Sequence, residues 1–103
     1  MKGTCKTEFV NSIKNGVALV DFNASWCTPC RIQSPIISNL MKRFEGRVKI
    51  TELNIDENRE TAFQLGIHSI PTIIIFRNGQ EIKRLIGLQS EDELIMAIDM
   101  VLR

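Results

Sequence analysis

The residues with the clearest capacity for chemistry are Cys27 and Cys30, which are separated by Thr28 and Pro29. On a helical turn, side chains three positions apart lie on the same face, so the two sulfurs can approach within bonding distance. At the start of a helix, free amide donors and the helix dipole stabilise a thiolate, the nucleophilic form of cysteine. Proline is well accommodated in a first helical turn. We therefore expect Cys27, at the exposed tip of a helix, to be the attacking thiol, and Cys30, one turn deeper, the resolving thiol.

A zinc site is the alternative interpretation of such a pair. The chain holds four residues of the types that zinc prefers, namely Cys5, Cys27, Cys30 and His68. Zinc knuckles, however, are built from two closely spaced ligand pairs, whereas Cys5 and His68 are each isolated in the sequence. A strand followed by Cys-x-x-Cys and a helix favours redox chemistry. We therefore expect no metal, an inert, half-buried Cys5 and a solvent-exposed His68.

The bulk properties are those of an ordinary globular protein: 103 residues, of which 44% are hydrophobic and 24% are charged. This length suits a single domain over residues 1–103. The net charge of +1 gives no electrostatic basis for binding nucleic acid or an anionic membrane. The apolar runs are too short to span a bilayer, and no apolar signal-peptide segment follows Met1. We expect a monomer located in the cytoplasm.

Segments of helical and extended periodicity alternate along the chain, which favours an α/β domain. Residues 17–22 form a continuous apolar run of strand length, as expected for a central strand covered on both faces. Asn78-Gly79 between two extended runs predicts a two-residue hairpin turn. Ser90 with Glu93 predicts a helix-capping box. The expected helices cover 4–14, 27–44, 58–65 and 90–102, and the expected strands cover 17–22, 48–55, 72–76 and 81–86.

Apolar side chains at helical spacing predict which faces of the first two helices are buried. The first helix is expected to bury Phe9, Val10 and Ile13. Pro35 lies inside the second helix and should kink it. The apolar side of this helix is expected to consist of Ile32, Ile36, Leu40, Met41 and Phe44.

Residues 20–30, with the sequence VDFNASWCTPC, resemble the active-site segment of the thioredoxin family. Further matches follow in order at compatible spacing, and together they cover about four fifths of the chain. They comprise Pro35, residues 53–56 and 66–72, Asn78-Gly79 and Gly87. The resemblance implies a thioredoxin-like α/β fold, in which a central mixed sheet of four strands has helices on both faces. A fifth strand is expected only if the residues before Thr4 form an edge stub.

The resemblance also implies roles for individual residues around the cysteines. Asp21 corresponds to a buried aspartate below the resolving cysteine, where it can accept the proton of Cys30. Pro71 corresponds to a cis-proline that faces the disulfide, and the backbone of Ile70 offers hydrogen bonds to an extended substrate. The implied substrate surface is completed by Trp26, Thr28, Pro29 and Gly87.

Three residues depart from the usual pattern of the family. Thr28 stands in place of a glycine between the cysteines, where residues influence redox behaviour. Asn23 stands in place of a second tryptophan, which makes the site more polar. Glu52 stands where the family usually has a lysine near the buried aspartate. A carboxylate at that position should raise the pKa of Asp21 further.

The activity implied by the resemblance is the reduction of disulfides in client proteins through a Cys27–Cys30 dithiol/disulfide couple. A thioredoxin reductase fed by NADPH, or another donor, would supply the electrons. No bound cofactor is required. One alternative is a thiol oxidase or isomerase of the same fold, made more oxidising by Thr28. The other is a non-catalytic docking subunit, which would keep its function without either cysteine.

Overall fold

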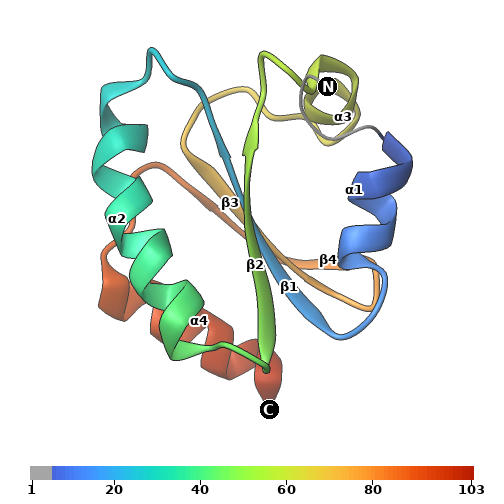
Figure 1. The fold of residues 1–103 in the computed structure, drawn as a ribbon, viewed down its shortest axis with the longest axis vertical. Coiled ribbons are helices and arrows are strands. Elements are labelled where there is room, and N and C mark those ends of the chain that lie inside the picture. The colour runs from blue at the N-terminus through green and yellow to red at the C-terminus, as the bar shows by residue number, and fades with distance from the viewer. Residues whose placement is uncertain (1–5) are drawn as a thin grey trace.

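The computed structural model describes residues 6–103, in which a four-stranded sheet lies between helices on its two faces (Figure 1). Each described boundary lies within two residues of its predicted position. The predicted start of the first helix, the edge stub before Thr4 and the expectation for Cys5 lie outside the described residues. In chain order the elements are α1 (Lys6–Ile13), β1 (Val17–Asn23), α2 (Thr28–Arg43), β2 (Val48–Asn54), α3 (Arg59–Gln64), β3 (Thr72–Arg77), β4 (Gln80–Ile86) and α4 (Glu91–Leu102).

The strands lie in the order β2-β1-β3-β4. β1 runs parallel to β2 and antiparallel to β3, and β3 pairs antiparallel with β4. Parallel neighbours need a crossover connection, which α2 provides between β1 and β2. The predicted mixed sheet with helices on both faces is therefore confirmed: α2 and α4 lie on one side of it, and α1 and α3 on the other (Figure 1).

The local sequence signals between the later elements are confirmed. Asn78 and Gly79 have φ angles of 50° and 87°, as a tight hairpin turn between β3 and β4 requires. The Asn78 side-chain oxygen also accepts a hydrogen bond from the Gly16 amide at 2.8 Å, which ties the hairpin to the start of β1. Ser90 and Glu93 form the capping box of α4 through reciprocal hydrogen bonds.

β1 is buried on both faces because it lies inside the sheet and its side chains point alternately to the two helical layers. Leu19 belongs to the core cluster that includes α2 and α4, and Val20 belongs to the cluster that includes α1. Phe9 and Ile13 cover the second face from α1. Val10 was predicted to join them, but this was wrong, because its side chain is 48% exposed.

The buried face of α2 also differs from the prediction. Ile32 is 53% exposed and Met41 is 37% exposed, whereas Gln33 and Ile37 are fully buried. Leu40 and Phe44 are buried as predicted, and Ile36 packs against the core. The apolar pattern missed Gln33 because a glutamine occupies a core position of this helix. The helix runs to Arg43 with Pro35 inside it.

Candidate active site

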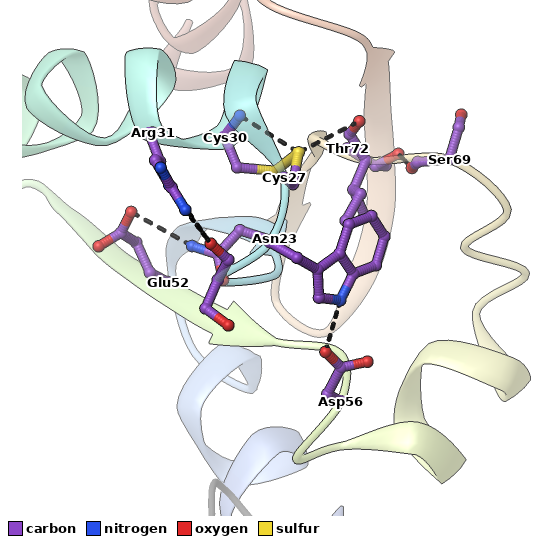
Figure 2. Close-up of a disulfide and its surroundings, with 11 residues drawn as sticks. Asn23, Cys27, Cys30, Arg31, Glu52, Asp56, Ser69 and Thr72 are labelled. Atoms are coloured by element: carbon purple, nitrogen blue, oxygen red, sulfur yellow. Dashed lines mark hydrogen bonds between the residues drawn. A yellow bond between two sulfur atoms is a disulfide. The ribbon is translucent and has the colours of Figure 1, made fainter.

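Cys27 caps the N-terminus of α2, directly after the turn that follows β1. Its Sγ accepts a hydrogen bond from the backbone N–H of Cys30 at 3.3 Å. The two cysteines form a disulfide, and their Cα atoms are 5.3 Å apart (Figure 2). In the reduced protein the same N–H and the helix dipole stabilise a thiolate at Cys27.

Both cysteines are nearly enclosed in the disulfide form. Cys27 is 5% exposed and Cys30 is 3% exposed. The prediction of an exposed tip was therefore wrong for Cys27 in this state. Cys27 is covered because the pair packs with Ala24, and the half-buried Ile55 and Ile70 lie against that cluster.

The segment before β3 faces the disulfide. The peptide bond between Ile70 and Pro71 is cis, as the resemblance implied. The carbonyl oxygen of Ile70 lies 3.8 Å from Cys27 Sγ, within the range in which a reduced thiol donates a hydrogen bond. Gly87, just after β4, donates its N–H to the Pro71 carbonyl at 2.9 Å. Its φ of 91° favours glycine, and a Cβ there would meet open space.

The surface beside Cys27 is formed by Trp26, Thr28 and Pro29, which are all exposed. Trp26 has the largest side chain, and it is 64% exposed. Its indole Nε1 donates a hydrogen bond to Asp56 Oδ2 at 2.8 Å (Figure 2). This bond fixes the indole edge and leaves most of its surface open, so Trp26 offers an apolar contact next to the disulfide. Nothing in the sequence predicted that Asp56 would accept a hydrogen bond from Trp26.

Asp21 is fully buried on β1, and neither of its carboxylate oxygens has a hydrogen-bond partner among the described residues. Burial raises the pKa of Asp21 from 3.8 to about 7, and the negative charge of Glu52 adds to the rise. Glu52 therefore raises the pKa of Asp21, as predicted from the sequence. A carboxyl group with this pKa can accept or give a proton near neutral pH.

Asn23 on β1 and Glu52 on β2, two of the residues that differ from the usual pattern of the family, contact each other. Asn23 Nδ2 donates a hydrogen bond to Glu52 Oε2 at 3.4 Å (Figure 2). Ser34 Oγ on α2 donates to the same oxygen at 2.9 Å. A hollow of about 200 Å³ lies beside this group and is also lined by Cys30. Sequence reasoning missed Ser34, although the parallel pairing of the two strands was a signal that could have linked Asn23 to Glu52.

Gln33 is a second residue of the site region that sequence reasoning missed. Its Nε2 donates to the Gln89 carbonyl at 3.0 Å, and its Oε1 accepts from the Gln89 amide at 2.8 Å. Both polar ends of this buried side chain are therefore paired, which explains why a glutamine fits the core face of α2. These two hydrogen bonds anchor the loop that follows Gly87 to α2, the helix that contains Cys30.

Replacing Gln33 with leucine is expected to lower the free energy of unfolding by about 2 kcal/mol, because two backbone groups of Gln89 lose their partners. Urea unfolding of the oxidised protein measures this loss. Gln64→Leu, at an exposed position on α3, is the matched control and should change stability by less than about 0.5 kcal/mol. Equal stability of the two variants would show that the Gln33 contacts contribute nothing.

Of the other two residues considered for metal binding, the structure describes only His68. His68 is exposed, as predicted, on the loop before Ile70. Within residues 6–103, no three His, Cys, Asp or Glu side chains gather in an arrangement that could hold a metal ion. Over the same residues, no helix has the length and apolar character needed to cross a membrane.

The sequence and the fold of this chain resemble those of known proteins. The model of the thioredoxin family matches residues 1–100. The chain is 38% identical over 92 residues to the thioredoxins of Staphylococcus aureus strains Mu50 and MW2, which covers 89% of this chain and 88% of each relative. A mutant thioredoxin from Halobacterium salinarum NRC-1 superposes with a TM-score of 0.88 at 30% identity, covering 95% of this chain and 86% of that one. Oxidized mitochondrial thioredoxin 3 from Saccharomyces cerevisiae gives a TM-score of 0.86 at 31% identity, covering 94% and 91%.

Proposed function

This chain belongs to the thioredoxin family and is a thiol–disulfide oxidoreductase with protein-disulfide reductase activity, and we propose that Cys27 attacks, Cys30 resolves and Asp21 accepts the proton. The Cys27 thiolate attacks a disulfide of a client protein, so that a mixed disulfide forms and one client sulfur leaves as a thiolate. Cys30 then gives its proton to Asp21, and its thiolate attacks the Cys27 sulfur. The second client sulfur leaves as a thiolate. The client is then reduced, and the Cys27–Cys30 pair is oxidised to a disulfide.

The position of Cys27 as the N-cap of α2 is the observation that carries this order. Cys27 Sγ receives the Cys30 N–H at 3.3 Å, and a thiolate there lies where the partial positive charge of the helix is greatest. Cys30 lies inside the first turn, over the face of the sheet that carries Asp21. Its thiol must be deprotonated at a largely buried position, which favours the carboxylate on that face over direct transfer to solvent.

Client proteins are proposed to bind at the surface around the disulfide. Trp26, Thr28 and Pro29 supply exposed contact area on one side of Cys27. The backbone at Ile70 and the cis Pro71 lies on the other side, close enough to offer main-chain hydrogen bonds to an extended client segment. Gly87, bonded to Pro71, borders the same surface. Main-chain pairing of this kind binds many sequences, which suits a reductase with several clients.

The proposed electron donor is a thioredoxin reductase that uses NADPH. Each turnover leaves the protein oxidised by two electrons, so a donor must return the pair to the dithiol before another client can react. Such a cycle runs where thiols are kept reduced, and we therefore propose the cytoplasm as its location. No bound cofactor is needed for the exchange itself.

The reduction potential of the Cys27–Cys30 pair tests this function. Equilibration against dithiol buffers of known potential, followed by trapping of free thiols, gives the value. Thiol–disulfide proteins range from about −270 mV for thioredoxins to about −120 mV for strong oxidants, and we expect a value near the reducing end. A potential above about −200 mV would favour an isomerase or oxidase and would implicate Thr28. The absence of a reversible couple would leave the docking subunit as the remaining function.

A further inference from the structure

Asp21 and Glu52 face the same side of the sheet. β1 and β2 pair in parallel, and side chains at paired positions point to the same face. The paired positions on the α2 side are Val17 with Val48, Leu19 with Ile50, Asp21 with Glu52, and Asn23 with Asn54. The first two pairs belong to or pack against the core cluster under α2. The two carboxyl groups are therefore neighbours beneath the helix that carries Cys30.

The two carboxyl groups have opposite relations to solvent. Asp21 is completely buried, no described group donates a hydrogen bond to its carboxylate, and Glu52 is the residue whose side chain interacts with it. Glu52 is exposed, and its Oε2 accepts from Ser34 Oγ at 2.9 Å and from Asn23 Nδ2 at 3.4 Å. Those donors come from α2 and β1, and they fix the Glu52 side chain beside the strand position that it shares with Asp21. One acid is thus enclosed, and its strand neighbour is fixed at the surface.

The hollow beside Cys30 lies next to the two side chains that hold Glu52. Its lining includes Cys30, Asn23 and Ser34, the last two being the donors that hold Glu52. Neither Asp21 nor Glu52 is among its lining residues. Glu52, which is paired with Asp21 across the two strands and is exposed, therefore links the buried carboxyl group to the surface on this face.

Four side chains from the neighbouring elements lie near Glu52. Two are ionisable, namely Asp21 on β1 and Arg31 on α2. Two are neutral, namely Asn23 on β1 and Ser34 on α2. The Arg31 guanidinium donates to the Ser25 carbonyl at 3.1 and 3.3 Å and makes no ion pair with Glu52 in the described part of the chain. Glu52 therefore faces one buried acid and two neutral donors, with no cation bonded to it.

We propose that Glu52 carries the proton of Asp21 to solvent, so that the two carboxyl groups work in series. The inference rests on the proposed role of Asp21. The Cys30 thiol gives its proton to the Asp21 carboxylate, and the Cys30 thiolate displaces the client sulfur from Cys27. The client sulfur leaves with the bonding electron pair and takes a proton from water. Asp21 passes its proton to the Glu52 carboxylate, which releases it to water, and both carboxylates are restored. In a molecule in which Asp21 already holds a proton, this transfer must come first, because only the carboxylate can accept the proton of Cys30.

The test is the rate at which a pre-formed mixed disulfide on Cys27 is resolved, measured in single turnover across the pH range around the Asp21 pKa. Glu52→Gln keeps an oxygen that Ser34 and Asn23 can bond, but it removes the group that exchanges protons. At low buffer its rate should fall about tenfold, less than for loss of a direct general base because water can still reach the hollow. Rising imidazole should restore the rate by accepting the proton, whereas wild type should not respond.

Two further variants separate the relay from the function on which it rests. Glu57→Gln removes an exposed carboxylate from the loop after β2 and should resolve at the wild-type rate. Asp21→Asn should slow resolution at every imidazole concentration and abolish the pH dependence. A Glu52→Gln protein with wild-type rates and no imidazole response, beside a slow Asp21→Asn protein, would overturn the relay alone. An Asp21→Asn protein that resolves normally would overturn the proposed role of Asp21 as well.

Discussion

The Cys30→Ser protein is expected to stop after the first step of the reaction, with client proteins attached covalently to Cys27. The backbone N–H that bonds Cys27 Sγ belongs to residue 30 and survives the substitution, so the attacking thiolate keeps its stabilisation. A serine hydroxyl cannot form the second disulfide, and the mixed disulfide therefore accumulates. Non-reducing electrophoresis with mass spectrometry should show one client per chain, while steady-state reduction falls to the uncatalysed background.

The reciprocal variants test the order of the two cysteines. Cys27→Ser should form no adduct and should also lack turnover, because Cys30 lies inside the helix, beyond the N-cap position at which a backbone N–H stabilises a thiolate. Adducts on Cys30 in that variant would contradict the proposed order. The double variant, Cys27→Ser with Cys30→Ser, distinguishes catalysis from docking: a docking subunit would retain its function without either sulfur, whereas a reductase loses all of it.

The features that the sequence predicted are those in which a few adjacent residues determine the local structure. Asn78-Gly79 permits the positive φ angles of the hairpin turn, and Ser90 with Glu93 supplies the reciprocal bonds of a cap. Apart from Asp21, residues 17–22 are apolar on both faces, which restricts that strand to the interior of the sheet. The position of the cysteine pair between β1 and α2 follows from the same local patterns.

The features that could not be predicted depend on partners distant in the sequence. Gln33 looks like a surface residue until the backbone of Gln89, 56 positions away, pairs with both ends of its amide. Glu52 and Ser34 meet because α2 crosses over the strand pair, and their hydrogen bond depends on rotations of the helix that periodicity does not determine. The exposure of Ile32 follows from the same rotation, since Gln33 takes the inward position.

Stability should fall as the pH rises through the range that separates the two pKa values of Asp21. Its pKa is about 7 in the folded protein and 3.8 as the ordinary value, so the folded state binds this proton more tightly than the unfolded state. Below pH 3.8 the group is neutral in both states, and above pH 7 the fold carries a buried, unpaired charge. The difference corresponds to about 4 kcal/mol, lost at about 1.4 kcal/mol per pH unit in between.

Asp21→Asn removes this titration and keeps the shape of the side chain, so its stability should lack the decline. Urea unfolding of the oxidised proteins over the same pH range should show the variant gaining steadily on wild type, up to about 4 kcal/mol in alkaline buffer. Asp99→Asn, which removes an exposed carboxylate from α4, should follow wild type throughout. A constant difference between Asp21→Asn and wild type at all pH values would mean that Asp21 ionises normally in the fold. Asp21 would then be a weak base, and its proposed role as acceptor of the Cys30 proton would lose its physical basis.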